Sequence, residues 1–353
     1  MRFLLKKIVL FIFFFVSASA KAEITIEPER WGELEELIND FSMRWRYSNE
    51  LVPKVKLIIH QVPKDKLIDF LSQKNNNELT LFIMAARYTD EKFVSVLIEA
   101  IKNNKEELKK IINIKNESGH TALSGAAANN QVEIMKILLA NGADIKTRSK
   151  GGVTVLMGAA SERGAGKETV RFLIGRGCDV NQKDDHGWTA LMHAFGIFTI
   201  TNIDVVKALV ENGADVTEKY SDGSTGLMNA SSAGDDAIVS YLIQHVQQTK
   251  GAEKAKSFID EQDKHGMTAL HFASRSNQGE KVVDILIKNH ADLNKKNKYE
   301  YSALMLTQSQ EIRKKLKDAG AFEKPETKID DLLQSLTTLK TKLIGLQEQL
   351  RKI

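Results

Sequence analysis

The stretch Asp263–Ala273 reads DKHGMTALHFA, and it contains the pattern G-x-T-x-L at Gly266–Leu270. The same pattern occurs four times earlier in the chain, beginning at Gly119, Gly152, Gly187 and Gly223. Successive glycines are 33, 35, 36 and 43 residues apart. Repetition at about this period is typical of repeat architectures, in which each supersecondary unit stacks on the next.

Each copy continues in a similar way, which predicts two helices per unit. In the first copy an alanine pair, Ala126-Ala127, is followed by the amphipathic run Val132–Leu139 and then by Asn141-Gly142-Ala143-Asp144. Similar endings occur at 176–179, 212–215 and 289–292. We expect the threonine to cap the first helix and the glycine to end the second helix in the left-handed conformation. The polar stretch that follows suits a turn between units.

This pattern resembles the ankyrin repeat family, whose units run roughly D-x-x-G-x-T-P-L-H-x-A-A, then a second helix, then G-A-D. Decayed copies at 78–82 and 300–304 extend the array to about seven units over 78–322, with degenerate units at its two ends. The family's proline is absent from every copy, and its histidine remains only at His271. The resemblance implies an all-α ankyrin-repeat solenoid, built of helix-turn-helix units with hairpin loops.

The segments before the array lack the repeat pattern. Residues 1–22 combine a basic start, the apolar run Ile8–Val16 and small residues in A-x-A order, which is the layout of a secretory signal peptide. An uncleaved anchor is the alternative, although the run is shorter than a membrane span requires. Residues 23–77 are predicted to form a small helical N-terminal cap on the array, and an independent binding module is the alternative there.

The C-terminal segment, 323–353, carries a heptad pattern that predicts a coiled-coil helix. Apolar residues alternate spacings of three and four at Ile329, Leu332, Leu336, Leu339, Leu343, Leu346, Leu350 and Ile353. We expect residues 329–353 to join copies of the chain into a homo-oligomer, and a helix that folds back onto the last repeat is the alternative. The flanking positions show no clear charge code, so the number and orientation of the strands stay open.

Two insertions interrupt the units. Residues 195–202 (FGIFTITN) are apolar where a polar turn is expected, so both a partner contact and a tolerated surface loop are open interpretations. Residues 247–257 (QQTKGAEKAKS) are polar, and we expect them to add a helix and a loop.

Composition and motif searches argue against catalysis and against nucleic acid. One cysteine in 353 residues excludes a disulfide framework and a Cys-based metal site. Residues 1–22 hold four basic residues and no acid, which equals the excess of +4 in the whole chain, so the mature chain would be neutral and would lack a basic footprint. Gly164–Lys167 is similar to part of a P-loop, but Ser161 and Glu168 replace its first glycine and its Ser/Thr. No histidine pair has metal-ligand spacing. We therefore expect no catalytic residue, no metal and no cofactor.

The resemblance also implies where a protein partner would bind, because ligands of such arrays meet the hairpin tips and the concave face of the first helices. The residues that follow the repeat glycines, and so would face that groove, are His120, Val153, Trp188, Ser224 and Met267, with Tyr301 at the same position in the last copy, where Glu300 replaces the glycine. The candidate residues at the hairpin tips are Glu117, Lys150, Asp185, His186, Lys264, His265 and Tyr299. Aromatic and methionine side chains on an open surface often become binding hot spots.

The sequence thus predicts an exported, non-enzymatic scaffold for protein–protein interaction, located in the periplasm or secreted. A bacterial effector that is secreted and binds host proteins is the alternative. We expect a protein partner, no nucleic acid, and no stable membrane span once the first 22 residues are removed.

Overall fold

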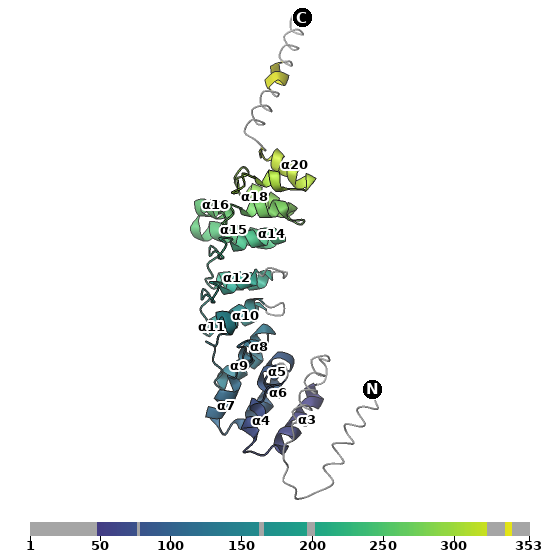
Figure 1. Cartoon of the computed structure of the whole chain (residues 1–353), viewed down its shortest axis with the longest axis vertical. Helices are drawn as coiled ribbons and strands as arrows, with labels where there is room; N and C mark the ends of the chain where they lie inside the picture. The colour runs from purple at the N-terminus through teal and green to yellow at the C-terminus, as the bar shows by residue number, and fades with distance from the viewer. Residues whose placement is uncertain (1–47, 76–77, 162–165, 196–201, 323–335, 341–353) are drawn as a thin grey trace, which may run out of the picture. The chain divides into compact units, whose positions relative to one another are not determined.

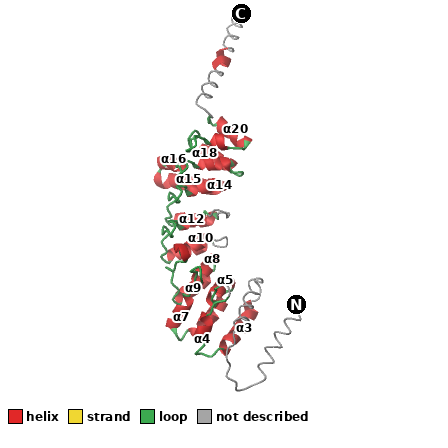
Figure 2. Ribbon diagram, viewed as in Figure 1, coloured by secondary structure: helices red, strands yellow, loops and turns green. Residues whose placement is uncertain are grey.

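The computed structural model describes residues 48–75, 78–161, 166–195, 202–322 and 336–340. Within them the fold is helical, and the only β-type pairings are three isolated bridges inside hairpins, such as Arg148 with Thr154 (Figure 1, Figure 2). The predicted all-α class of stacked two-helix units is confirmed for these residues. The predicted signal peptide (1–22), residues 23–47 of the predicted cap, residues 196–201 of the apolar insertion and most of the predicted coiled coil lie outside the described residues.

The chain divides into two compact units, which we describe separately. Unit 1 contains residues up to Gly125 together with Glu133–Asp144, and unit 2 contains Ala126–Val132 and the residues from Ile145 onward. The boundary runs through helix α8 (Ala122–Ala128).

Unit 1 holds more helices than the repeat pattern predicts. Its other helices are α3 (Ser48–Gln61), α4 (Leu67–Ser72), α5 (Leu81–Tyr88), α6 (Glu91–Ile101), α7 (Lys105–Ile112) and α9 (Val132–Ala140). Helix α3 packs on α6, and α7 packs on both α4 and α6. The described part of the segment predicted as a cap therefore contains α3 and α4. Helix α7 was not predicted, and it begins where the Asn104 side chain accepts a hydrogen bond from the N–H of Glu107 at 3.2 Å.

Unit 2 contains two rows of helices. The first helices of its repeats are α10 (Val155–Ser161), α12 (Ala190–Ala194), α14 (Gly226–Ala233), α17 (Ala269–Arg275) and α19 (Ala303–Leu306). The second helices are α11 (Lys167–Gly175), α13 (Ile203–Glu211), α15 (Asp236–Lys250), α18 (Glu280–Lys288) and α20 (Gln310–Asp318). Each second helix packs on the next, from α11 to α20. Among the first helices, α10 packs on α12, α14 on α17, and α17 on α19.

The polar insertion at 247–257 adds a helix to unit 2, as predicted. Helix α15 continues to Lys250, Gly251 turns the chain, and α16 (Ala252–Ile259) packs back on α15. The turn needs glycine because Gly251 has φ = 89° and ψ = 168°, a combination that L side chains rarely adopt.

The predicted caps are present in both units. In each of five repeats a threonine hydroxyl accepts a hydrogen bond from the backbone N–H three residues further along the chain. This bond satisfies one of the free donors at the start of the first helix. The pairs are Thr80–Ile83, Thr121–Ser124, Thr154–Met157, Thr189–Met192 and Thr225–Met228, at 3.2 to 3.4 Å. In the best-matching copy the imidazole of His271 contacts both the Thr268 hydroxyl at 2.8 Å and its N–H at 3.1 Å.

The second helices end as predicted. Gly142, Gly177 and Gly213 have φ between 91° and 92°, the left-handed conformation that ends a helix at little cost for glycine. His290 occupies the same position at φ = 61°, which is an unusual conformation for a residue with a side chain. None of the helices in the described part of the chain has both the length and the apolar character needed to cross a bilayer.

Candidate protein-binding surface

Three hairpins of unit 2 are closed by a polar side chain at the base. In the Gly187 hairpin, the N–H of Asp184 donates to the carbonyl of Trp188 at 3.0 Å, and Asp184 Oδ1 accepts the N–H groups of His186 and Trp188 at 2.9 Å each. Asp263 holds the Gly266 hairpin and Asn297 holds the last hairpin in the same way. The loops that carry the predicted tip residues are therefore fixed by their own side chains and not only by packing.

Neighbouring hairpins of unit 2 are joined by backbone hydrogen bonds, which we call the hairpin ladder. The N–H of Asp185 donates to Gly151 at 3.0 Å, that of Lys264 to Asp222 at 2.8 Å, and that of Lys298 to His265 at 2.9 Å. Across the hairpins that the structure describes in unit 2, the step from Gly187 to Gly223 is the one without such a bond.

At that step three aromatic side chains, Trp188, Phe195 and Tyr220, take the place of the ladder; we call them the aromatic junction. Tyr220 occupies the position at which the other hairpins of unit 2 carry Asp, Asn or Ser, and its hydroxyl donates to the carbonyl of Met192 at 2.8 Å. Its ring meets Trp188 edge-on, with centroids 5.3 Å apart. Phe195, at the end of α12, lies against Gly226 so closely that a Cβ atom there would be 2.3 Å from the ring.

The junction also contains a hydrogen bond between a buried carboxylate and a histidine. Asp184 is 7% exposed, and its Oδ2 lies 2.8 Å from Nε2 of His193, whose ring meets Trp188 at 5.5 Å. Burial alone would raise the pKa of Asp184, but the hydrogen bonds from Trp188, His193 and His186 outweigh it and hold this pKa below its ordinary value. Asp184 is thus a fixed negative charge that orients both the hairpin and the His193 ring.

The structure places most of the predicted binding residues at the surface. Half-buried positions are found for His120, Val153 and Trp188. Exposed positions are found for Glu117, Lys150, Asp185, His186, Lys264, His265, Tyr299 and Tyr301. Glu117 and His120 belong to unit 1, and the others belong to unit 2. Nine of the thirteen candidates therefore lie on the hairpins of unit 2 and are exposed or half-buried.

The prediction that Met267 and Ser224 face the groove was wrong, because each residue is buried, with an exposed fraction of 6%. The sulfur of Met267 accepts a hydrogen bond from Asn297 Nδ2 at 3.3 Å, so Met267 packs between two hairpins. The hydroxyl of Ser224 donates to Asp222 at 2.6 Å and so closes its own loop. Phe195, the first residue of the apolar insertion, is 5% exposed and packs inside unit 2 against Gly226, so it is not a partner contact.

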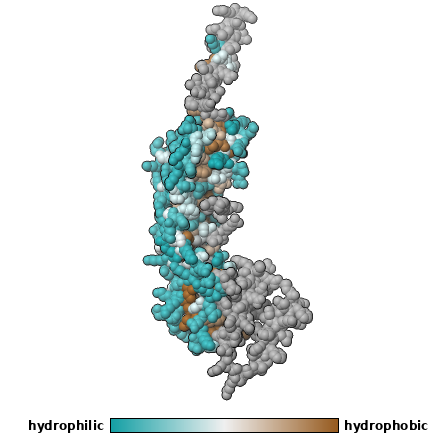
Figure 3. Space-filling model, in the orientation of Figure 1, coloured by the Kyte–Doolittle hydropathy of each residue, from teal (hydrophilic) through white to brown (hydrophobic). Residues whose placement is uncertain are grey.

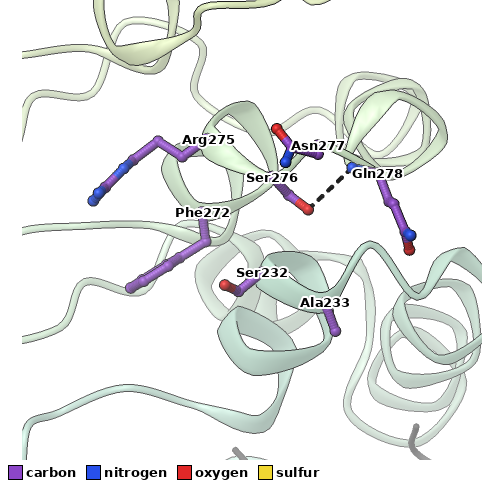
Figure 4. Close-up of a pocket in the computed structure, with 7 residues that line it drawn as sticks. All are labelled: Ser232, Ala233, Phe272, Arg275, Ser276, Asn277 and Gln278. Atoms are coloured by element: carbon purple, nitrogen blue, oxygen red, sulfur yellow. Dashed lines mark hydrogen bonds between the residues drawn. The ribbon is translucent and has the colours of Figure 1, made fainter. Parts of the chain in front are cut away.

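The sequence reasoning missed a hollow between the C-terminal ends of α14 and α17. It has a volume of about 640 Å³ and is lined by Ser232, Ala233, Phe272, Arg275, Ser276, Asn277 and Gln278. Figure 4 shows the Phe272 ring and the Arg275 side chain extending to the same side of α17, away from Gln278, whose N–H donates to Ser276 Oγ at 3.3 Å. Phe272 directly follows His271, so its place in the repeat motif was the signal that could have revealed it.

Two features that the sequence raised can be checked in the described residues, a metal site and the lone cysteine. No group of three or more His, Cys, Asp or Glu side chains in the described ranges is arranged to hold a metal ion. Burial raises the pKa of the Cys178 thiol to about 11, so at neutral pH this cysteine is a neutral thiol and a poor nucleophile.

Comparison with known proteins identifies the family. The sequence profile of ankyrin repeats matches three times, over residues 47–149, 146–220 and 197–297, and the chain belongs to the ankyrin repeat family. The first match begins inside the segment that we had separated from the array as a cap.

Individual relatives match smaller parts of the chain. Ankyrin repeat and SOCS box protein 6 of Pongo abelii is 37% identical over 75 residues, which cover 21% of this chain and 18% of that protein. The match thus spans about a fifth of the length of this curated relative. The crystal structure of the ankyrin repeat domain of Bcl-3 aligns with a TM-score of 0.53 at 23% identity, covering 69% of this chain and all of that one. An ankyrin repeat domain from Acinetobacter baumannii aligns with a TM-score of 0.47 at 26% identity, covering 57% of this chain and 98% of that one.

Proposed function

We propose that this chain is an exported scaffold that binds a protein partner through its hairpin tips and the groove beside its first helices. The observation that carries the proposal is the row of exposed tip residues in unit 2, held on hairpins that are closed by Asp184, Asp263 and Asn297. Ankyrin repeats typically mediate protein–protein interaction. A surface that is fixed before binding loses little conformational entropy when the partner arrives.

The proposal of export rests on the sequence of residues 1–22, with its basic start and short apolar run. We propose that the mature chain is periplasmic or secreted. Fractionation separates the two cases, because a periplasmic protein stays with gently washed cells, whereas an effector that acts on host proteins leaves them. Retention of a full-length, uncleaved chain in the cytoplasm would contradict both.

The binding proposal is tested by affinity purification of the full chain from its native cell envelope. The test variant replaces Asp185, His186, Lys264 and His265 by alanine, all four exposed at hairpin tips. The control replaces Lys254 and Lys281, which are exposed on α16 and α18. We expect the partner to be retained by the wild type and the control and lost from the tip variant. Equal capture by all three proteins would contradict binding through the tips.

A second proposed property is self-association through 329–353. Leu336 and Leu339, two of the heptad positions, are 61% and 62% exposed, so they form an unpartnered apolar pair on the helical turn 336–340. A second copy of the same helix would cover them. Removing 327–353 should lower the solution mass, measured by light scattering, to that of one chain. An unchanged mass would contradict the coiled coil.

A further inference from the structure

Exposed apolar side chains gather in one place on unit 2. Among the described residues 145–322, the large apolar side chains that are exposed are Tyr299, Tyr301 and Met305, at 67%, 47% and 37%. All three come from the last hairpin and the helix that follows it. Figure 3 shows that hydrophilic colours dominate the visible face of the described residues, with brown confined to small areas. Isolated exposed apolar residues need no explanation, but three within seven positions form a patch.

Three cations on the last two hairpins and at the end of α17 form no salt bridge among the described residues. Lys264 and Lys298 are exposed on the two adjacent hairpins, which the bond from Lys298 N–H to His265 joins directly. Arg275 is exposed at the end of α17. In the part of the chain that the structure describes, none of the three forms a salt bridge. The hydrogen bond from His271 Nε2 to the carbonyl of Tyr301, at 3.1 Å, ties the last hairpin to α17.

The acidic residues of these hairpins are already engaged. Asp263 is buried at 9% exposure and accepts the N–H groups of His265 and Met267, both at 2.8 Å. Glu300 is paired with Lys296 at 2.9 Å. Asp222, on the preceding hairpin, accepts the hydroxyl of Ser224. Among the described residues, Lys264 and Lys298 thus have no acidic partner on these hairpins.

We propose that this face, defined by Tyr299, Tyr301, Met305, Lys264, Lys298 and Arg275, docks an acidic protein segment that also carries bulky apolar side chains. The apolar residues of the partner cover the tyrosines and the methionine, and its carboxylates pair with the three cations. This proposal rests on the proposed binding function and names the chemistry of the partner. Charge complementarity of this kind mainly sets specificity and association rate, whereas the apolar contacts supply most of the affinity.

A nucleic acid would also supply negative charge and flat rings, but the observations favour protein. Exposed carboxylates, Asp185 and Asp222, lie on the two preceding hairpins of unit 2 and would repel a continuous phosphate backbone. An acidic peptide segment is short enough to use the last two hairpins alone.

The experiment measures binding of labelled probes to the full chain by fluorescence anisotropy. One peptide of about a dozen residues alternates glutamate with phenylalanine and leucine. Two matched peptides replace the glutamates by lysine or the apolar residues by serine, and an oligothymidylate tests the nucleic-acid alternative. We expect the acidic apolar peptide to bind about tenfold or more tightly than the other probes, and its affinity to fall as salt rises.

The variants assign that binding to this face. Reversing charge with Lys264→Glu and Lys298→Glu should weaken the acidic apolar peptide about tenfold, and so should Tyr299→Ser with Met305→Ser. The control, Lys254→Glu with Lys281→Glu, changes the net charge equally and should leave the affinity unchanged. All these residues are exposed, so unchanged circular dichroism and thermal midpoints are expected and show that the variants fold.

Each other result overturns the proposal. Preference for oligothymidylate, equal binding of the three peptides, no binding of any peptide, or equal loss in the control variant would each do so. Failure here is distinguishable from failure of the scaffold proposal. A native partner captured equally by the charge-reversed and wild-type chains, but lost from the variant at Asp185, His186, Lys264 and His265, would defeat the acidic-segment proposal and leave the scaffold proposal standing.

Discussion

Two neighbouring pairs of hairpins in unit 2 are joined in different ways. From the Gly223 hairpin to the Gly266 hairpin, a backbone bond joins Lys264 to Asp222 and α14 packs directly on α17. Between the Gly187 hairpin and the Gly223 hairpin, the side chains of the aromatic junction make the contacts in place of a backbone hydrogen bond. A ladder bond can form with almost any side chain, whereas the junction depends on the shapes of particular rings. Stability at the second step should therefore be much more sensitive to substitution than stability at the first.

The largest effect is expected for Phe195→Ala. Phe195 is 5% exposed, and removing its ring leaves a cavity beside Gly226, so we expect the free energy of unfolding to fall by about 3 kcal/mol or more. Urea unfolding of the full chain measures it. A loss of less than about 1 kcal/mol would mean that the neighbouring helices close the gap, and that the ring is not what holds this step together.

Gly226→Ala tests the same contact from the other side. The new Cβ atom would lie 2.3 Å from Phe195 Cε2, so we expect a loss of about 1–3 kcal/mol from overpacking. The matched control is Gly158→Ala in α10, where nothing lies within 4 Å of the new Cβ and the helix propensity of alanine should stabilise by up to about 1 kcal/mol. In the Phe195→Ala background the cost of Gly226→Ala should disappear. Additive losses would show that the two residues do not contact each other.

Tyr220→Phe removes only the hydroxyl that donates to Met192. We expect a loss of about 1 kcal/mol, because the carbonyl of Met192 loses a buried partner while the ring packing against Trp188 remains. Tyr241→Phe is the control, since no hydrogen bond of the Tyr241 hydroxyl is found among the described residues. Similar effects of both substitutions on the thermal midpoint would show that the hydrogen bond from Tyr220 to Met192 does not stabilise the junction.

The smallest effect concerns the loops that follow α11 and α16, where Asn181 and Asp260 hold equivalent positions. Asn181 bridges to the next repeat twice, donating to the Gly213 carbonyl at 2.9 Å and accepting the Asp215 N–H at 3.0 Å. Asp260 accepts the Asp292 N–H at 2.8 Å, but an ionised carboxylate has no proton to donate. We expect Asp260→Asn to stabilise the chain by about 0.5 kcal/mol at neutral pH.

The pH dependence of that gain has a definite sign. Burial and the nearby Asp292 charge raise the pKa of Asp260, so the folded state binds its proton more tightly than the unfolded state does. The carboxyl therefore disfavours folding above its folded pKa and no longer does so below its ordinary value. The advantage of Asp260→Asn should shrink as pH falls through this range in thermal unfolding. A gain that stays constant with pH would assign the effect to the amide hydrogen bond alone.

The sequence predicted the regular parts of the fold because they rest on local chemistry. A threonine hydroxyl can reach only the start of its own helix, and Gly142, Gly177 and Gly213 occupy positions that require positive φ. Both features can therefore be recognised from the sequence. The tip residues lie at the surface for the same reason, whereas their role in binding stays a prediction. Met267 and Ser224 were misplaced because their burial depends on Asn297 and Asp222, partners that the repeat period does not reveal.

The aromatic junction was not predictable from the pattern. Phe195 stands where α10, α14 and α17 have alanine or serine, and an apolar residue there indicates equally a partner contact or an internal one. Its meaning depends on Gly226, which lies in the next copy and was taken as one more variant of the repeat. Helix α7 was missed because it falls within a spacing that the decayed first copy left unassigned. At the aromatic junction the deciding contact lies between two repeats of unit 2 and not within one repeat.

Repeat arrays can evolve by duplicating, deleting or shuffling whole modules, since each module normally accepts any neighbour. The fit of the Phe195 ring onto Gly226 removes that freedom for one pair. A copy carrying the phenylalanine clashes with any successor that has a Cβ at the matching position, and a copy carrying the glycine leaves a void beneath any predecessor without the ring. These two repeats should therefore be retained together, because separating them creates either a clash or a cavity.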